Sequence, residues 1–317
     1  MTRLNKDKPS NVTASVRHRL LDIIRETGDD ANLVWTRYAA ERFLYRLCVS
    51  EYAEDFVLKG AMLFMAWTGR SHRPTVDIDF LGHGENSDKR LVQIFRAVCG
   101  VEVEDDGLIF DPDTIKVAPI REGQEYQGQR VMLTAFLGKA RIPLQVDVGF
   151  GDVVTPEPRI IIYPTLLDFP APRIRSYPHE TVIAEKLQTV VVRGIANSRM
   201  KDFYDLYVLA RDFAFDGETL TRAIGATFSR RRTEIPQEPP LALTEEFARD
   251  DVKSVQWTAF VRKSGIEQDV PQLLEVLSHL RQFLFPLLRA TSGQAYVPKY
   301  WSPGGPWVFA ESVPNIP

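Results

Sequence analysis

The sequence predicts an α+β fold, with a core built on a mixed or antiparallel sheet and a helical C-terminal half. Residues 75–81 alternate polar and apolar side chains, as expected for a strand, and a period of two recurs through residues 100–150. After residue 178 the apolar side chains instead recur every three or four positions, which is typical of amphipathic helices. This change of period separates the sheet from the helical half.

The expected elements are supported by local sequence features. Gly28 follows the first apolar-periodic segment, where a glycine commonly ends a helix. Pro74 and Gly82 bound the strand at residues 75–81. The expected helices lie at residues 11–27, 30–49, 61–69, 88–98, 178–193, 199–213, 217–229 and 271–288, and the expected strands at 56–58, 75–81, 115–120, 130–137 and 142–148.

The chain divides into three predicted parts. Residues 1–150 hold the N-terminal helices and the sheet-built core. Residues 151–177 are rich in proline and are expected to form a connector with little regular structure. Residues 178–317 form a helical domain that ends in a tail, from residue 291, with aromatic residues among prolines and glycines. We expect this tail to pack across the surface in an extended form.

The composition of the 317-residue chain excludes several classes of protein. Apolar residues at 44% and charged residues at 26% are usual for a globular protein, and a net charge of -3 argues against indiscriminate nucleic-acid binding. Two cysteines cannot form a disulfide framework or a four-cysteine zinc site. Without an apolar leader or a long apolar span, the protein is expected in the cytoplasm, with no membrane contact.

Asp77-Ile78-Asp79 carries the most specific chemical information. Residues i and i+2 of a strand point to the same face, so both carboxylates project side by side. Two like charges this close repel each other, and a divalent cation relieves the repulsion. Oxygen ligands in an open site favour Mg²⁺ or Mn²⁺. A bare Asp-x-Asp is more often part of a solvent-facing strand, so its surroundings decide the interpretation.

Two further features accompany the carboxylate pair. Asp147 lies on a later predicted strand, with apolar neighbours on both sides. Lys59-Gly60-Ala61 leads from an apolar strand into a helix, and a small turn at a helix N-terminus lets backbone N–H groups approach phosphate oxygens. The combination indicates a site for a metal and a phosphorylated substrate.

This arrangement resembles the nucleotidyltransferase superfamily of the DNA-polymerase-β type. Within it, the chain is similar to the AbiEii/AbiGii toxin branch, to which the mycobacterial MenT toxins belong. The resemblance covers roughly residues 15 to 215 and is carried by four blocks, at residues 56–60, 73–80, 179–187 and 199–206. It implies a nucleotidyltransferase core within residues 1–150.

The resemblance also implies roles for individual residues. Asp77, Asp79 and Asp147 would bind the metal, and Asp147 would also help to deprotonate the acceptor. Lys186 would hold the triphosphate of the NTP, and Asp202 would belong to the catalytic set. The residues expected to bind the nucleotide or its phosphates are Lys59, Gly60, Ala61, Arg73, Lys186, Lys201 and Asp205.

The residues themselves leave alternatives open for several of these roles. Many superfamily members carry Ser or a second Gly after the first glycine, whereas Ala61 and Met62 follow Gly60 here, so phosphate binding would rest on backbone N–H groups and Lys59. A lysine such as Lys186 on a helix is usually solvated. Asp202 and Asp205 could simply stabilise a helix N-terminus. The basic run at residues 230–232 is more often a solvated surface than an RNA contact.

The function implied by the resemblance is that of a toxin from a toxin–antitoxin, abortive-infection-like system. It would add a nucleoside monophosphate from an NTP to an RNA acceptor, at the 3′ end of tRNA, and so block translation. A cognate antitoxin of winged-helix type would be its partner. Two alternatives stay open: transfer to a Ser, Thr or Tyr hydroxyl of a protein, and a non-catalytic nucleotide-binding module.

Overall fold

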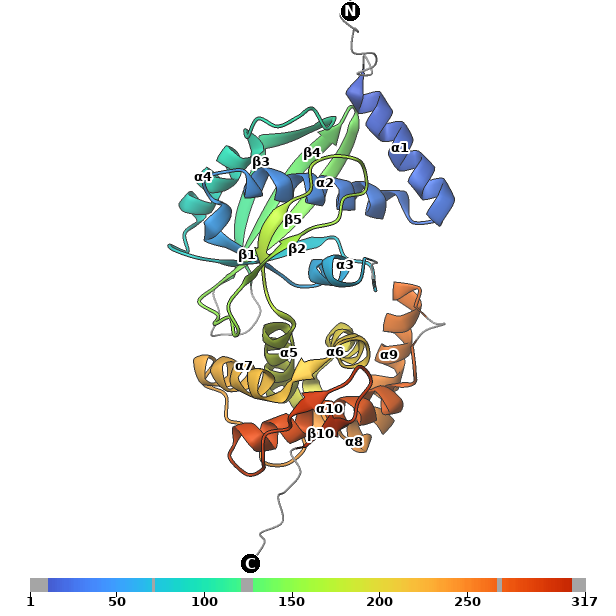
Figure 1. The fold of residues 1–317 in the computed structure, drawn as a ribbon. Helices are drawn as coiled ribbons and strands as arrows, with labels where there is room; N and C mark the ends of the chain where they lie inside the picture. The colour runs from blue at the N-terminus through green and yellow to red at the C-terminus, as the bar shows by residue number, and fades with distance from the viewer. Residues whose placement is uncertain (1–10, 70–71, 121–127, 267–269, 310–317) are drawn as a thin grey trace, which may run out of the picture. The chain divides into compact units, whose positions relative to one another are not determined.

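The computed structural model describes residues 11–69, 72–120, 128–266 and 270–309 (Figure 1). The chain separates into two compact units. Unit 1 comprises residues 1–151 and 159–176, and unit 2 comprises residues 152–158 and 177–317. The chain therefore passes between the units three times.

Unit 1 is built on a seven-stranded mixed sheet with the strand order β3-β4-β5-β2-β1-β7-β6. Two of its neighbouring pairs, β2 with β5 and β1 with β7, are parallel, and the others are antiparallel. The chain leaves β2, forms the β3-β4-β5 meander and returns beside β2. The strands are β1 (Phe56–Lys59), β2 (Asp77–Gly82), β3 (Leu108–Ile120), β4 (Gly128–Leu137), β5 (Ala140–Phe150), β6 (Arg159–Ile162) and β7 (Arg173–Ser176).

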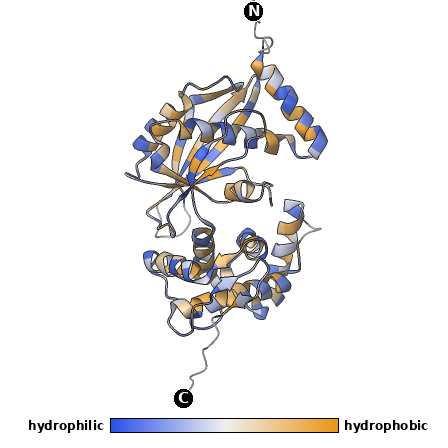
Figure 2. Cartoon of the chain, viewed as in Figure 1, coloured by the Kyte–Doolittle hydropathy of each residue, from blue (hydrophilic) through white to orange (hydrophobic). Residues whose placement is uncertain are grey.

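Helices α2 (Ala31–Cys48) and α4 (Asp88–Cys99) cover one face of this sheet (Figure 1). Phe43 of α2 stacks on Phe95 of α4 with ring centroids 5.5 Å apart, and Phe56 of β1 lies 6.1 Å from Phe95 and 5.4 Å from Phe80 of β2. Because side chains alternate along a strand, the residues between these buried ones point to the opposite face. Figure 2 shows this alternation of apolar and polar residues along the long strands.

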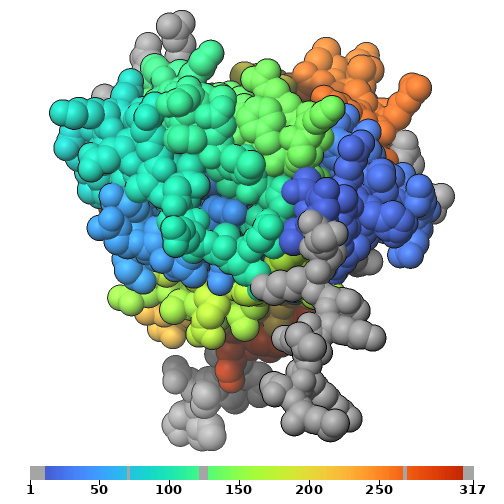
Figure 3. All heavy atoms as spheres, turned by 90° about the horizontal axis from the view of Figure 1, so that it is seen from above, coloured from blue at the N-terminus to red at the C-terminus, as the bar shows by residue number. Residues whose placement is uncertain are grey.

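The ends of the unit 1 helices follow from local capping. Asn11 and Asp30 accept hydrogen bonds from backbone N–H groups in the first turns of α1 (Val12–Thr27) and α2, and Ser87 does so for α4. Gly28 ends α1 in a left-handed conformation. The segment between β1 and β2 holds the short helix α3 (Met62–Thr68). Figure 3 shows the face of unit 1 formed by α4, β3 and β4 in teal and green, beside α1 in dark blue.

Unit 2 is mainly helical. Its longest helix, α10, buries an apolar stripe that includes Leu277, Leu280 and Leu284. The helices are α5 (His179–Arg193), α6 (Met200–Asp212), α7 (Gly217–Arg230), α8 (Glu245–Arg249), α9 (Asp251–Ser264) and α10 (Leu273–Thr291), and a small sheet has the order β10-β9-β8, from Trp307–Val308, Tyr300–Trp301 and Phe215–Asp216.

The aromatic tail is partly built into unit 2. Trp301 and Trp307 are register partners on β9 and β10 and are buried. Their indole N–H groups donate to the backbone oxygens of Ala210 and Phe283, at 2.7 and 2.8 Å. The tail is thus anchored through two tryptophans rather than only lying across the surface, and its last residues, 310–317, lie outside the described part of the chain.

The predicted connector at residues 151–177 requires a correction, because it contains β6 and β7 of the main sheet. Both strands are four residues long and contain no proline, whereas Pro158 precedes β6 and Pro172 precedes β7. Proline next to a strand does not interrupt its hydrogen bonds. The density of prolines therefore concealed two strands that fit between them.

Helix α9 was not predicted, and β3 begins well before the expected strand at residues 115–120. Only Lys253 and Trp257 of α9 are buried, so the helix has almost no apolar periodicity. A register irregularity between Asp111 and Lys116 interrupts the alternation along β3. The predicted α+β class, with a mixed sheet and a helical second half, is confirmed. Among the described residues, no helix combines the length and hydropathy needed to cross a bilayer.

Candidate active site

Asp77 and Asp79 of β2 point away from the face that α2 and α4 cover. Their neighbours Ile78 and Phe80 are completely buried on the covered face, while both aspartates are half-buried. The two carboxylates therefore project from the same face of β2, as expected from the sequence.

A row of charged residues crosses four strands on this same face. Lys59 of β1 is the register partner of Asp79, Asp79 is the partner of Asp147 on β5, and Asp147 is the partner of Arg130 on β4. Paired residues of neighbouring strands carry their side chains on the same side of the sheet. Asp77 has Gln145 as its partner on β5. The sheet register thus assembles two cations and three carboxylates in one place.

The turn after β1 lies directly against this row. Gly60 has a φ of +77°, which favours glycine, and a Cβ atom at this position would collide with the carboxylate of Asp79. Helix α3 begins immediately afterwards, at Met62. The backbone of the Gly60 turn therefore lies directly against the side chain of Asp79.

Lys59 reaches across the sheet from this turn. Its Nζ atom lies 3.4 Å from the position that a Cβ of Gly149 would occupy on β5. Gly149 is two residues after Asp147 and therefore has the same side-chain direction. The ammonium of Lys59 thus extends over β2 to β5, on the face that holds the carboxylates.

Asp147 is held by Arg130 in a bidentate ion pair. Arg130 Nε donates to Oδ1 at 2.8 Å and Nη2 donates to Oδ2 at 2.7 Å. The Gln145 amide lies 3.4 Å from each of the two oxygens. The side chain of Asp147 is 17% exposed and that of Arg130 is 41% exposed. Sequence analysis did not identify Arg130, because its role depends on a strand register that no local pattern reveals.

The second group of predicted residues assembles within unit 2. Lys186 of α5 contacts two aspartates of α6: its Nζ lies 2.6 Å from Asp202 Oδ1 and 2.9 Å from Asp205 Oδ2. Arg199 Nε donates to the other oxygen of Asp202 at 2.6 Å. Lys186 is therefore not a solvated helix residue, and the two aspartates do not merely stabilise a helix N-terminus.

The burial of this group is uneven. Asp202 and Asp205 are 2% and 1% exposed, while Lys186 and Arg199 are 16% and 31% exposed. Burial acts to raise the pKa of Asp202, but the charges of Lys186 and Arg199 together outweigh it and hold that pKa below its usual value. Asp202 is thus a carboxylate at neutral pH, and its two cations have access to solvent.

Other predicted residues have less defined surroundings. Ala61 is nearly buried at the start of α3, and Arg73 is half-buried in the irregular segment before β2. Lys201 is exposed on α6. In the basic run at residues 230–232, Arg231 is only 12% exposed and pairs with Asp152 at 3.0 Å and Glu185 at 3.3 Å. This arginine serves an internal network of unit 2.

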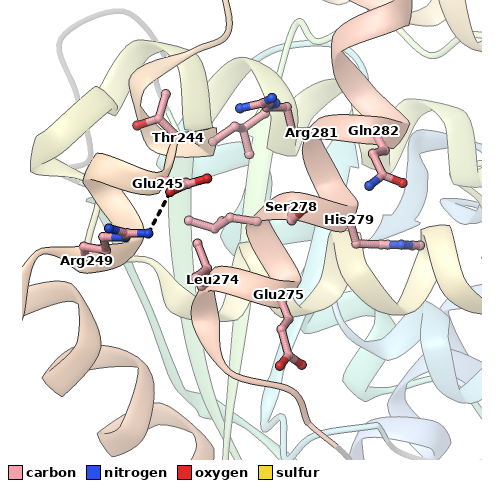
Figure 4. A pocket seen from close by; sticks show the side chains of 11 residues that line it. Thr244, Glu245, Arg249, Leu274, Glu275, Ser278, His279, Arg281 and Gln282 are labelled. Atoms are coloured by element: carbon pink, nitrogen blue, oxygen red, sulfur yellow. Dashed lines mark hydrogen bonds and ion pairs between the residues drawn. The ribbon is translucent and has the colours of Figure 1, made fainter.

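Unit 2 also has an open pocket of about 480 Å³ between the segment before α8, α8 itself and α10 (Figure 4). Its lining includes the ion pair between Glu245 and Arg249, at 3.0 Å, and His279. None of the predicted site residues lines it. Within the described residues, no group of three or more His, Cys, Asp or Glu side chains is arranged to hold a metal ion by itself.

The structure thus has a carboxylate-bearing strand, β2, between β1 and β5, with a glycine turn against Asp79. Comparison with known families identifies the class: residues 42–279 match the family model described as "Nucleotidyl transferase AbiEii toxin, Type IV TA system". The match spans most of the chain, which therefore belongs to the AbiEii toxin family. The predicted enzyme class and family resemblance are confirmed, and the family implies an NTP substrate and a cognate antitoxin.

Two solved structures from Helicobacter pylori are similar over much of the chain. A crystal structure assigned to a nucleotidyltransferase has 15% sequence identity and a TM-score of 0.46, and the alignment covers 80% of this chain and 94% of that one. JHP933 has 16% identity and a TM-score of 0.44, with 80% and 90% covered. No curated protein matches the sequence significantly. The family assignment rests on the sequence match.

Proposed function

We propose that this toxin transfers a nucleoside monophosphate from an NTP to an RNA acceptor, with the 3′ end of tRNA as its target. The observation that carries the proposal is the position of Asp77 and Asp79 on one face of β2, with the Gly60 turn against Asp79. Carboxylates can bind a metal ion and a glycine turn can bind phosphates, so together they suit a metal-bound nucleotide.

Asp77 and Asp79 fit Mg²⁺ or Mn²⁺, because both offer carboxylate oxygens and both are half-exposed. Magnesium is commonly bound by one or two carboxylates together with substrate phosphates and water. When bound, the ion neutralises charge on the phosphates as it develops during displacement. The remaining tasks of binding and orientation fall to the protein's own residues.

The phosphates of the NTP are bound by backbone N–H groups of the Gly60 turn and by the ammonium of Lys59. The family resemblance is the ground for proposing Lys186 as a further phosphate ligand. Within unit 2, Lys186 is held by Asp202 and Asp205, and Asp202 is proposed to orient it. The same resemblance adds Arg73, Lys201 and Asp205 to the proposed nucleotide-binding residues. A hydroxyl oxygen of the acceptor forms a bond to the α-phosphorus, the bond to the β-phosphate oxygen breaks, and pyrophosphate and a proton are released. Positioning and charge neutralisation provide most of the acceleration.

An RNA acceptor is supported by the resemblance of the four sequence blocks to toxins that modify the tRNA 3′ end. Modification of that end prevents aminoacylation and so stops translation. The antitoxin is proposed to be a winged-helix protein on the same grounds.

The test incubates the protein with MgCl₂, total tRNA and each α-³²P-labelled NTP in turn. We expect label on tRNA from one or two of the four nucleotides. The loss in an Asp79→Asn variant should be about 10³-fold, since the metal contributes several kcal/mol of transition-state stabilisation. Arg96→Gln is the matched control, because Arg96 is exposed and pairs only with the exposed Asp113 among the described contacts.

Label on protein instead of RNA would show that the acceptor is a side-chain hydroxyl. An Asp79→Asn variant as active as the wild type would remove the carboxylate pair from the mechanism. Equal loss in the Arg96→Gln control would mean that the assay reports folding rather than chemistry.

A further inference from the structure

Asp147 is in an unusual position for a metal ligand, because a guanidinium already occupies both of its oxygens. The two hydrogen bonds from Arg130 are 2.8 and 2.7 Å long, which is the range of strong charge-assisted bonds. A cation bound to Asp147 would lie next to this permanent positive charge and be repelled by it.

The metal does not need Asp147. Two carboxylates with substrate phosphates and water make a usual magnesium site, and Asp77 and Asp79 supply those two. Within the described residues, Asp147 does not join them in a group arranged as a metal centre. Asp147 and Arg130 therefore require a different explanation.

The position of Arg130 and Asp147 in the sheet suggests an explanation for their pairing. In the order β4-β5-β2-β1, Arg130 lies on β4 and the Gly60 turn follows β1, so they flank the carboxylates of β2 on opposite sides. Neighbouring strands are about 4.8 Å apart, so the backbone of Arg130 is roughly 10 Å from that of Asp79. An arginine side chain spans much of this distance.

An in-line displacement also needs groups on two opposite sides of the reacting atom. The leaving pyrophosphate and the attacking hydroxyl lie on opposite sides of the α-phosphorus. With the triphosphate on the Gly60 turn, the acceptor enters from the side of β4, where Arg130 is 41% exposed.

We propose that Arg130 binds a backbone phosphate of the RNA acceptor beside its reacting 3′ hydroxyl, and that Asp147 is a positioning residue for Arg130 rather than a metal ligand. The inference rests on the proposed RNA acceptor. A guanidinium is planar and fork-shaped, so a carboxylate that engages one edge fixes the direction of its other N–H groups. The pair thus presents a preset phosphate-binding group.

The experiment separates the acceptor, the nucleotide and the metal. Arg130→Gln, Asp147→Asn and the double variant are compared with wild type and with Arg96→Gln. The KM values for RNA and for NTP are measured at several salt concentrations. Binding of Mn²⁺ to the protein is measured separately by electron paramagnetic resonance, with Asp79→Asn as the variant that loses it.

We expect Arg130→Gln and Asp147→Asn each to raise the KM for RNA about tenfold, as loss of a hydrogen bond to a charged group does. The KM for NTP and the affinity for Mn²⁺ should stay within about twofold of the wild type, because the removed groups contact neither. The double variant should be no worse than either single one, since both remove the same contact. The slope of log KM for RNA against log salt should fall by about 0.7 to 1.

The assignment of Asp147 is overturned if Asp147→Asn weakens Mn²⁺ binding as much as Asp79→Asn does. An increase in the KM for NTP rather than for RNA in Arg130→Gln would place this arginine on the nucleotide instead. Wild-type protein that labels no RNA would overturn both the proposed acceptor and the phosphate contact. The Mn²⁺ measurement still decides the role of Asp147 in that case.

Discussion

Two bidentate arginine–aspartate pairs in the described part of unit 1 have similar bond lengths and very different surroundings. Arg46 contacts the two oxygens of Asp106 at 2.6 and 3.0 Å, and Arg130 contacts those of Asp147 at 2.8 and 2.7 Å. Arg46 and Asp106 are 7% and 0% exposed, whereas Arg130 and Asp147 are 41% and 17% exposed. The hydrogen-bond lengths do not separate a structural pair from one able to bind a ligand, whereas access of the guanidinium to solvent does.

The sealed pair belongs to a larger network. Arg42 Nε donates to Asp106 at 3.0 Å, and the Tyr38 hydroxyl donates to the backbone oxygen of Asp106 at 2.8 Å. All three donors are on α2, so the network holds this helix to the segment that enters β3. The side chains of Arg42, Arg46 and Asp106 are at most 7% exposed, so the network is a buried structural element.

The largest expected effect is on the sealed pair. Asp106→Ala leaves two buried arginines without their counter-charge and should lower the free energy of unfolding by about 3–5 kcal/mol. The matched Asp147→Ala variant should lose less than about 1 kcal/mol, because its partner is half-exposed and can be solvated. Urea unfolding followed by circular dichroism measures both. Equal losses in the two variants would contradict the distinction by solvent access.

Lys186 extends the comparison to unit 2, with an exposure between those of the two arginines. Lys186→Met should lower kcat/KM for the NTP about 10²-fold, as removal of one transition-state donor does. Its loss of stability should be smaller than that of Asp106→Ala, because Arg199 still pairs with Asp202. Steady-state kinetics and urea unfolding report the two effects, with Lys263→Met on the exposed side of α9 as control. A variant with wild-type kinetics would make Lys186 purely structural.

A further expected effect depends on pH and concerns Glu41, which precedes Arg42 on α2 and is buried. Burial raises the pKa of Glu41 from 4.5 to about 8, although Arg42 opposes this and the Leu166 N–H donates to its Oε2 at 2.9 Å. Since the folded pKa is the higher one, the contribution of Glu41 to stability is complete below about pH 4.5 and is lost as the pH rises through about 8.

Glu41→Gln keeps the acceptor for Leu166 and removes this titration. Between about pH 5 and 8, the unfolding free energy of the wild type should fall relative to the variant by about 1 kcal/mol per pH unit. Urea unfolding at several pH values tests the difference. Parallel pH profiles would show that Glu41 is ionised in the folded protein.

The parts of the fold that could be predicted have strong local periodicity. The segments at residues 11–27, 88–98 and 178–193 show apolar residues at helical spacing, and each contains a helix. Helix α9 has too few buried residues to produce a pattern, and β6 and β7 are too short and too close to prolines. Weak patterns follow from limited burial, which depends on distant parts of the chain.

The candidate site divides in the same way. Asp77, Asp79 and Gly60 could be identified because each lies in a short motif with its own physical meaning. Lys186 and Asp202 could be singled out only by family resemblance, since their contact joins two helices. Arg130 could not be found at all, because it meets Asp147 across two strands.

The sequence alone determined that two carboxylates leave the same face of one strand and that a glycine turn leads into a helix. These are local properties, since alternation along a strand and a positive φ depend on only a few neighbouring residues. Tertiary structure alone decided that Arg130 engages Asp147, that Lys59 extends over Gly149 and that Asp106 is sealed. Strand register and burial arise when distant segments pack together. The same two residue types therefore form a buried structural pair in Arg46–Asp106 and a pair with an exposed guanidinium in Arg130–Asp147.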